Sequence, residues 1–487
     1  MSDAALPPLQ ISEVQRSVTA ELDRIAPVID ELGRRFREAG QELALVGGPV
    51  RDAMLGRHHN DFDFTTSARP DQTEDLLRGW ADAIWDMGRA FGTIGCRKGD
   101  WQVEITTYRS ETYDPSSRKP DVDFGDSLAG DLGRRDFTVN AMAVLVPDRT
   151  FEDPYGGVVD LANGVLRTPG RPEDSFSDDP LRMMRAARFA SQLGFAVAPE
   201  VVAAMTAMAD RIEIISAERV RDELVKLICG RHPRLGLSLL VETGLAARVL
   251  PELPALALER DEHHRHKDVY EHTLTVMEQS IDLESRLAGD GTAGSPDFTS
   301  RFAALMHDVG KPRTRRFLDD GTVTFHHHDV VGAKITRKRM KALRFSNDEI
   351  DAVTSLVELH LRFHGYAAGE WTDAAVRRYV RDAGDQLERL HILTRADCTT
   401  RNQRKADRLR RTYDDLEERI ARLSEEEELA SIRPDLDGNE IMELLGIPAG
   451  PLVGEAYRFL LEHRMENGPQ TPKSVRAVLL DWWSGRS

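Results

Sequence analysis

A glycine turn that leads into an acidic strand most constrains how this chain folds. Residues 45–52 read Leu-Val-Gly-Gly-Pro-Val-Arg-Asp, and residues 61–64 read Asp-Phe-Asp-Phe. Alternate side chains of a strand share a face, so Asp61 and Asp63 are expected to point the same way. Two neighbouring carboxylates repel each other unless a cation lies between them, and Mg²⁺ prefers oxygen ligands. The pair therefore predicts a magnesium site.

The residues of the turn point to a substrate that carries phosphate. Gly47 and Gly48 leave backbone N–H groups open to an anion, and Arg51 adds a positive charge beside them. Taken alone, the aspartate pair would also fit a turn or a surface strand. Together with Gly48 and Arg51 as nucleotide-binding candidates, it predicts metal-assisted chemistry on a nucleoside triphosphate.

A third carboxylate lies in a predicted β-hairpin. Residues 93–97 and 102–108 alternate as strands on either side of Lys-Gly-Asp, a sequence typical of a tight turn. Glu104 lies in the second strand and would join Asp61 and Asp63 as a catalytic carboxylate. Three acids on adjoining strands are able to hold two Mg²⁺ ions. The alternative for Glu104 is an ordinary strand residue that faces solvent.

Two adjacent arginines follow a polar segment. Residues 109–130 contain Pro115 and Pro120 and are expected to form a mobile loop. Arg134 and Arg135 come next, and a guanidinium pairs with phosphate through two hydrogen bonds, so this pair is a candidate clamp for a triphosphate. The alternative is a surface salt bridge with the following Asp136. Asp136 and Asn140 themselves are expected to brace the local backbone.

Charged residues recur every three positions from residue 179 onward. Asp-Pro at 179–180 predicts a helix start, with the aspartate as N-cap, and the helix is expected to end at Gly194. Spacing of three places the side chains along one helix face. A carboxylate beside a guanidinium presents the hydrogen-bonding edge of a pairing base, which suits cytosine and adenine but not uracil or guanine. The alternative is a capping aspartate with solvated arginines. The members of this set are Asp179, Arg182, Arg185 and Arg188.

Length and composition define the broad class of protein. A chain of 487 residues is too long for one core, and 40% hydrophobic with 30% charged residues fits a globular protein. The sequence has no apolar run long enough to cross a membrane and no leader pattern, so no membrane partner is expected. Three scattered cysteines favour a reducing compartment, which we take to be the cytoplasm.

A net charge of −17 argues against a nucleic-acid partner only if charge is spread evenly. The basic segment 401–411 is a local exception. It is either an RNA-binding patch or a solvated helix face balanced by the acidic residues 414–428.

We expect an α+β chain: an N-terminal head with a small mixed sheet and helices, then an all-α neck, a helical domain and a helical tail. An amphipathic helix is predicted over residues 11–39, and the pattern after Pro172 is helical almost to the end. Breaks in the tail are expected at Gly446, Pro448, Gly450, Pro451 and Gly454. The predicted division is 1–40, N-terminal helix; 41–166, head; 167–258, neck and body with base recognition; 259–400, histidine-rich domain; and 401–487, tail and candidate tRNA-binding region.

The ordered motifs resemble those of the bacterial tRNA nucleotidyltransferases, the CCA-adding enzymes. The resemblance covers about the first 230 residues and rests on Gly47–Asp52, Asp61–Asp63, Arg134–Asp136, Asp178–Arg182 and the helix through Arg188. It implies a head, neck, body and tail, with Mg²⁺ at the two aspartates. It also implies addition of C, C and A to the 3′ end of tRNA from CTP and ATP.

A series of histidines and aspartates between residues 263 and 400 resembles the HD superfamily of metal-dependent phosphohydrolases. Imidazole and carboxylate ligands suit a second, transition-type divalent metal with an open position for water. The resemblance implies phosphatase or 2′,3′-cyclic phosphodiesterase activity. Five further histidines, at positions 263, 264, 266, 326 and 327, are expected at the surface. The candidate ligands are His272, His307, Asp308, His328, His360 and Asp397.

Two other functions remain compatible with these motifs. Poly(A) polymerases share the head and neck but make long A tails, and an enzyme that adds only part of CCA would have the same motifs. A phosphohydrolase or RNA-binding protein with a decayed transferase head is a rival of another class, and the intact Asp61, Asp63 and Arg51 speak against it. The sequence leaves the oligomeric state open.

Overall fold

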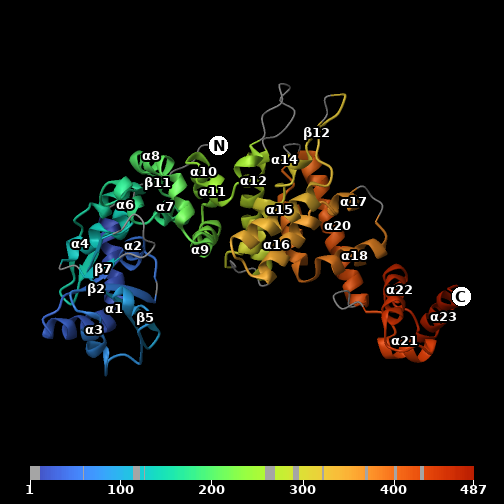
Figure 1. Cartoon of the computed structure of the whole chain (residues 1–487), viewed down its shortest axis with the longest axis horizontal. Coiled ribbons are helices and arrows are strands. Elements are labelled where there is room, and N and C mark those ends of the chain that lie inside the picture. Colours follow the sequence, from blue (N-terminus) through green and yellow to red (C-terminus); the bar gives the residue numbers. More distant parts are fainter. Residues whose placement is uncertain are drawn as a thin grey trace. The chain divides into compact units, whose positions relative to one another are not determined.

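The computed structural model describes residues 11–58, 60–112, 121–124, 127–257, 269–288, 295–320, 323–367, 371–399, 403–427 and 433–486. The chain divides into two compact units, residues 1–251 and 252–487. In Figure 1 the first unit runs from blue to green and the second from yellow-green to red. Each unit is described by itself below.

A mixed seven-stranded sheet forms the centre of the head. Its order is β3-β4-β5-β2-β1-β8-β9, and only β2 and β5 pair in parallel. The strands are β1 (Leu43–Val46), β2 (Asp61–Thr66), β3 (Ala83–Trp85), β4 (Thr93–Lys98), β5 (Trp101–Thr107), β8 (Ala143–Leu145) and β9 (Thr150–Glu152). The predicted first strand, acidic strand and β4–β5 hairpin are confirmed, and Gly99 takes the positive φ of 58° that the hairpin turn requires.

Helices surround this sheet as the sequence pattern predicts. The N-terminal amphipathic helix is α1 (Ile11–Glu38), and the glycine turn leads into α2 at Gly48. The apolar run 137–146 contributes its last part to the sheet as β8, which pairs with β1. The remaining helices of the head are α2 (Gly48–Met54), α3 (Pro70–Leu77), η1 (Arg89–Phe91), α4 (Leu128–Gly133), η2 (Thr138–Asn140) and α5 (Gly157–Asn163).

The polar segment 109–130 is not entirely a loop. Residues 109–112 and 121–124 pair as the antiparallel strands β6 (Arg109–Thr112) and β7 (Asp121–Phe124). Residues 113–120 and 125–126, which include both prolines, lie outside the described residues. The sequence pattern did not reveal this short ribbon, because its strands are only four residues long and residues 109–112 (Arg-Ser-Glu-Thr) include no apolar residue.

The rest of the first unit is helical, as expected, apart from a two-stranded parallel pair. That pair joins β10 (Val165–Leu166) to β11 (Ala196–Val197). The predicted helix at 179–194 is α7, which begins at Leu181 rather than Pro180 and ends at Gly194 with φ 75°. Asp179 still caps it, because its carboxylate accepts a hydrogen bond from the Leu181 N–H at 3.1 Å. The helices are α6 (Pro172–Asp178), α7 (Leu181–Leu193), α8 (Pro199–Ala207), η3 (Ala209–Ile214), α9 (Ala217–Ile228), α10 (Pro233–Glu242) and α11 (Ala246–Val249).

The second unit begins with η4 and a bundle of helices around a buried core. Its largest fully buried side chains include Phe302, Phe363 and Tyr379. A small hairpin pairs β12 (Arg316–Phe317) with β13 (Val323–Thr324). The helices are η4 (Pro254–Leu256), α12 (Val269–Asp282), η5 (Glu284–Ala288), α13 (Phe298–Met306), α14 (Lys311–Thr314), α15 (His328–Ala342), α16 (Asn347–Leu359), α17 (Phe363–Ala367), α18 (Asp373–Ala383), η6 (Gly384–Gln386) and α19 (Leu387–Ala396).

The described residues of the tail include the helices α20 (Gln403–Glu427), α21 (Gly438–Leu445), α22 (Pro451–Asn467) and α23 (Pro472–Ser484). The last three pack around a core of Leu436, Ile441, Leu460 and Leu479. Gly446 ends α21 at φ 63°, as predicted, and Pro451 starts α22. The prediction that Gly454 interrupts the helical pattern is wrong. Gly454 lies within the first turn of α22, where a helix tolerates glycine.

Two further features match expectations about the whole chain. Within the described residues, no helix has the length and apolar character needed to cross a membrane. No disulfide bond joins the three cysteines; Cys96 is buried, and Cys229 and Cys398 are partly exposed.

Candidate active site and metal centre

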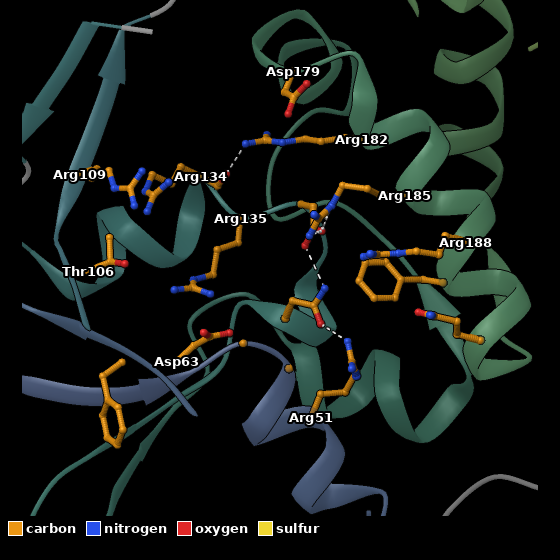
Figure 2. Close-up of a pocket in the computed structure, with 17 residues that line it drawn as sticks. Arg51, Asp63, Thr106, Arg109, Arg134, Arg135, Asp179, Arg182, Arg185 and Arg188 are labelled. Carbon is orange, nitrogen blue, oxygen red and sulfur yellow. Dashed lines mark hydrogen bonds and ion pairs between the residues drawn. The ribbon is translucent and has the colours of Figure 1, made fainter. Parts of the chain in front are cut away.

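A polar cavity of about 610 Å³ lies in the first unit, where the head meets the neck helices (Figure 2). This volume suits a nucleotide-sized ligand. The glycine turn, strand β2, the segment after α4 and helix α7 all contribute to its lining. The predicted site residues among that lining are Gly48, Arg51, Asp63, Arg134, Arg135, Asp179, Arg182, Arg185 and Arg188.

The acidic strand lies at the edge of this cavity. Asp61 and Asp63 occupy the exposed face of β2, while Phe62 and Phe64 are buried on the other. Glu104 pairs directly with Asp63 in the neighbouring strand and is exposed on the same face. Burial raises the pKa of Asp63, and the charges of Glu104 and Asp61 raise it further, against the attraction of Arg135. The negative charge that three carboxylates bring together is what a divalent cation would neutralise.

The turn before α2 brings backbone close to a guanidinium. Gly47 has φ 74°, and a Cβ at this position would lie 2.9 Å from Nη1 of Arg135. A Cβ at Gly48 would lie 3.7 Å from Nη2 of Arg51, which is an ordinary contact. The close approach that requires glycine is therefore at Gly47, the neighbour of the predicted Gly48.

A buried aspartate that the sequence analysis missed holds both adjacent arginines. Asp131 is fully buried, and its Oδ1 accepts from Nε and Nη2 of Arg134 at 3.0 and 2.8 Å. Its Oδ2 accepts from Nη2 of Arg135 at 3.3 Å. Burial raises the pKa of Asp131, but Arg135 and Arg134 more than offset it and hold the pKa below its usual value. Nε of Arg135 is buried without a hydrogen-bond partner in the described chain.

A chain of hydrogen bonds connects α2, η2 and α7. Arg51 donates from Nε and Nη2 to Asp52 and from Nη1 to Asn140 at 2.7 Å. Asn140 donates to Asp136 at 2.9 Å, and Arg185 donates from Nε to Asp136 at 2.7 Å (Figure 2). Burial raises the pKa of Asp136, but Arg185 and Asn140 outweigh it and lower that pKa to about 2. The expected bracing role of Asp136 and Asn140 is thus seen, and Arg51 and Arg185 share it.

Asp179 and Arg182 lie at the opposite end of the cavity from Asp63 (Figure 2). The Oδ2 of Asp179 accepts from Nη2 of Arg219 on α9 at 2.9 Å. Arg182 is held by the Ser175 hydroxyl at 2.9 Å and by the backbone oxygen of Arg134 at 2.6 Å. Both side chains are therefore fixed in position at the cavity surface.

Arg188 has a partner that the helical spacing did not reveal. Its Nε lies 3.1 Å from Oε2 of Glu223, and both side chains are almost fully buried. The guanidinium also stacks over Phe189 at 4.2 Å. Burial, only partly offset by Glu223, lowers the pKa of Arg188 to about 10. Arg188 thus lines the cavity with its charge already balanced.

The predicted HD ligands gather in the second unit. Two groups of side chains, His272 with His307 and Asp308, and Asp308 with His328 and His360, each have ligand atoms within 4.8 Å of one another. Asp397 completes the set, since its Oδ1 lies 3.0 Å from Nε2 of His272. Of the described residues, only these groups bring three or more such ligand atoms so close together. Residues 307, 328, 360 and 397 lie at or next to helix ends.

Three imidazoles of this cluster have the same orientation. The Nδ1 atoms of His307, His328 and His360 lie 2.7–2.8 Å from backbone oxygens of residues 304, 325 and 357. The carbonyl fixes the proton on Nδ1 and leaves a lone pair on Nε2. Each Nε2 is buried and has no hydrogen bond within the described chain. Burial lowers the pKa of His360 to about 4, so its ring is neutral. This donor set fits a divalent metal.

Within the part of the chain that the structure describes, the remaining histidines do not join the cluster as ligands. His326 and His327 are exposed, as predicted. Positions 263, 264 and 266 lie outside the described residues. Sequence reasoning missed Asp131, Glu223 and Arg219; only Asp131 carried a signal, because it precedes Arg134 and Arg135 by three and four residues on a helical segment.

Comparison with known proteins agrees with both sites. Three family models match the chain in order: "Poly A polymerase head domain" at residues 43–167, "Probable RNA and SrmB- binding site of polymerase A" at 194–256, and "HD domain" at 269–402. The fold and the cavity thus define a nucleotidyltransferase head followed by an HD domain.

An "A-adding tRNA nucleotidyltransferase" of Deinococcus radiodurans is 34% identical over 447 residues, which covers 90% of this chain and 95% of the relative. The chain belongs to the tRNA nucleotidyltransferase family. A "CCA-adding enzyme" of Levilactobacillus brevis is 42% identical, but over 226 residues only, 46% of this chain and 55% of the relative.

Solved structures support the same fold. A Bacillus stearothermophilus CCA-adding enzyme in complex with CTP matches with a TM-score of 0.65 and 25% identity, covering 94% of this chain and 98% of its own. A Thermotoga maritima CCA-adding enzyme complexed with tRNA has a TM-score of 0.61 at 18% identity and covers 96% and 98%.

Proposed function

We propose that the protein adds C, C and A to the 3′ end of tRNA from CTP and ATP without a template. The tRNA 3′-oxygen attacks the α-phosphate of the bound nucleotide, a new phosphodiester bond forms, and pyrophosphate leaves. The observation that carries this proposal is one cavity that holds an acidic strand at one end and a fixed carboxylate–guanidinium pair at the other.

The acidic end of the cavity is where Mg²⁺ would bind. Asp61 and Asp63 would hold it, with Glu104 beside them on the same face of the sheet. The raised pKa of Asp63 supports this, because crowded carboxylates bind a proton or a cation more readily. Bound Mg²⁺ supplies activation of the attacking hydroxyl and neutralises charge on the leaving pyrophosphate.

Between the two ends, Arg134 and Arg135 would bind the triphosphate. Asp131 fixes both guanidinium groups, yet each side chain remains about one-fifth exposed toward solvent. The unpartnered Nε of Arg135 leaves one donor for a phosphate oxygen. Arg51 and Arg185 would support this arrangement by keeping α2 and α7 in register rather than by direct contact.

At the far end, Asp179 and Arg182 would read the base. The carboxylate accepts from an exocyclic amino group, and the guanidinium donates to a ring nitrogen or carbonyl. Cytosine and adenine present that pattern, whereas uracil and guanine do not. Arg219 would hold one carboxylate oxygen of Asp179 at 2.9 Å and so set its orientation.

The test uses the purified full chain, a tRNA that ends before CCA, and each nucleoside triphosphate singly and combined. We expect three added nucleotides that require CTP and ATP. An Asp179→Ala variant should relax or lose the choice of nucleotide. Unchanged selectivity for CTP and ATP in that variant would reject the base-reading role.

A narrower activity has one specific observation in its favour. A relative that aligns along almost the whole chain is named an A-adding enzyme, whereas the CCA-adding relative of Levilactobacillus brevis aligns with 46% of this chain. The same assay decides, with a second tRNA that already ends in CC. Extension of only the second tRNA, by one A, would assign A addition; a long A tail would assign poly(A) synthesis.

The HD cluster is a second, separate site, for which we propose phosphohydrolysis. His272, His307, Asp308, His328, His360 and Asp397 would hold a divalent transition metal, and the unpartnered Nε2 atoms support this. Such a metal supplies an activated water for attack on a phosphate ester. Replacing His307 and Asp308 by alanine should abolish release of phosphate from phosphomonoesters or opening of 2′,3′-cyclic phosphates while nucleotide addition continues. Loss of both activities together would contradict two separate sites.

We expect the protein to work in the cytoplasm, in keeping with three cysteines that form no disulfide bond.

A further inference from the structure

A second polar pocket, of about 430 Å³, lies in the second unit, away from the HD cluster ligands. Helices α17 and α20 and the segment that leads into α18 form it. Its lining combines aromatic rings with guanidinium groups and comprises Tyr366, Trp371, Arg408, Arg411, Thr412, Asp415 and Arg419.

The aromatic wall of this pocket is held in place. The rings of Tyr366 and Trp371 meet edge to face, with centroids 5.3 Å apart. The Tyr366 hydroxyl donates to Asp415, and the backbone oxygen of Trp371 accepts from Nη1 of Arg419 at 3.0 Å. Arg419 also donates to Asp373 from Nε and Nη2 at 2.8 and 2.6 Å. These contacts hold the two rings and Arg419 in place and form a preorganised surface.

The charge left over in the pocket is positive. Three guanidinium groups face a single carboxylate, and that carboxylate, Asp415, is occupied by Tyr366. Arg408 and Arg411 are exposed, and neither guanidinium has a hydrogen bond or ion pair with any described residue. Arg404 lies one turn before Arg408 on the same helix face and is likewise exposed. Unpaired arginines are notable on a chain whose net charge is −17.

We infer that this pocket binds an unpaired nucleotide of RNA, with its base against Trp371 and Tyr366 and its flanking phosphates on Arg408 and Arg411. Proteins read unpaired RNA by stacking bases on aromatic rings and by pairing phosphates with arginine. The inference rests on the proposed function, since the loops of a tRNA substrate provide unpaired nucleotides. It assigns the basic segment of α20 to substrate binding, where the sequence left that role open.

The test measures binding of the full-length protein to a tRNA that ends before CCA, by fluorescence anisotropy across a range of salt concentrations. An Arg408→Ala/Arg411→Ala variant should bind about tenfold more weakly. The slope of log affinity against log salt concentration should be smaller in magnitude by about 1.4. Each phosphate contact on a single strand contributes about 0.7 to this slope, and two such contacts are lost.

Arg410 provides the matched control. It lies on the same helix but outside the pocket, and its Nη1 is 3.5 Å from Asp407. Arg410→Ala should change tRNA affinity less than twofold. An equal loss in this control and in the double variant would mean diffuse attraction by the helix charge and would overturn the pocket.

A second pair of variants tests the aromatic wall. Trp371→Leu should weaken tRNA binding several-fold without changing the salt slope, and Trp371→Phe should restore it, with circular dichroism confirming that both fold. Two results would overturn the inference. The first is wild-type affinity for tRNA in both Trp371→Leu and Arg408→Ala/Arg411→Ala. The second is an acidic peptide that displaces tRNA from the wild type but not from the double arginine variant. Nucleotide addition by the same wild-type preparation reports separately on the proposed function, because the pocket is judged from affinity differences alone.

Discussion

At the scale of single residues, Asp136 connects the two halves of the candidate active site. Its carboxylate accepts from Asn140 and from Arg185, and Asn140 in turn accepts from Arg51. The residues come from the head and from the neck helix α7, so one buried carboxylate connects the glycine turn to the helix that carries Arg182 and Arg185. The sequence predicted a bracing role for Asp136, but not that its partner would be an arginine 49 positions away.

An Asp136→Asn variant should lose about 3 kcal/mol of stability, because a charge on Arg185 is left without its buried partner. Urea unfolding of the full chain, compared with wild type, measures this. The control is Asp148→Asn, whose partner Arg37 and whose own side chain are both more than half exposed, so the loss should stay below about 1 kcal/mol. Equal losses in the two variants would contradict the account.

The low pKa of Asp136 also predicts that its contribution to the free energy of unfolding depends on pH. The pKa of Asp136 is about 2 in the folded protein, below its ordinary value of 3.8. Its contribution is therefore complete above the ordinary pKa and disappears as pH falls from about 4 to about 2. The gap in urea midpoint between wild type and Asp136→Asn should be constant above about pH 5 and should narrow toward pH 2. A gap that widens with acid would show that the carboxylate is not stabilised by its charge.

At the scale of elements, the glycine turn between β1 and α2 determines where Arg135 lies. Gly47 and Gly40 share a positive φ, 74° and 71°, but only Gly47 has a neighbour within 4 Å of an added Cβ. Both alanine variants should lose about 1 kcal/mol of stability from the left-handed backbone. Gly47→Ala alone should also lower the rate of nucleotide addition, by roughly tenfold to a hundredfold, because Arg135 must move.

Steady-state incorporation of labelled CTP checks this pair of variants. The Gly40→Ala protein serves as the control for backbone strain. Equal rates in the two variants would mean that the position of Arg135 does not matter for the reaction.

Much of the element pattern could be predicted because it follows from local periodicity. Strands β1, β2 and the β4–β5 hairpin alternate clearly, and Gly40 and Gly194 mark helix ends. The same is true of the HD cluster, whose ligands share a recognisable order along the chain. The sequence did not reveal that residues 137–146 join the sheet. A short apolar run is equally consistent with a buried strand of the sheet and with a segment that packs on the face of the sheet. It also missed Glu223, because its contact with Arg188 spans 35 positions.

At the scale of the whole molecule, two chemical sites lie in two separate compact units. The nucleotide cavity is built from residues 47–192, and the HD cluster from residues 272–397. No residue is common to both. The chain therefore combines a candidate nucleotide cavity and a candidate metal centre whose stabilities are expected to respond independently to their ligands.

Metal binding should stabilise the second unit alone. Adding Ni²⁺ after treatment with a chelator should slow hydrogen exchange in α13 and α16, where the free energy of opening should rise by up to about 2.7 kcal/mol at a hundredfold excess over the dissociation constant. Exchange in α7 should not change. A His307→Ala/Asp308→Ala variant should show no metal effect in α13 and α16, and an equal effect there would place the metal elsewhere.

The most direct measurement of the central claim is nucleotide addition by Asp63→Ala. Wild-type protein and this variant are incubated with CTP, ATP and Mg²⁺ and with tRNA that ends before CCA or after CC, and the products are sized on a gel. Asp148→Ala serves as the control for loss of a carboxylate at the surface. We predict extension to a mature end by the wild type and the control, and none by Asp63→Ala. Extension at the wild-type rate by Asp63→Ala would contradict the assignment of this strand to catalysis.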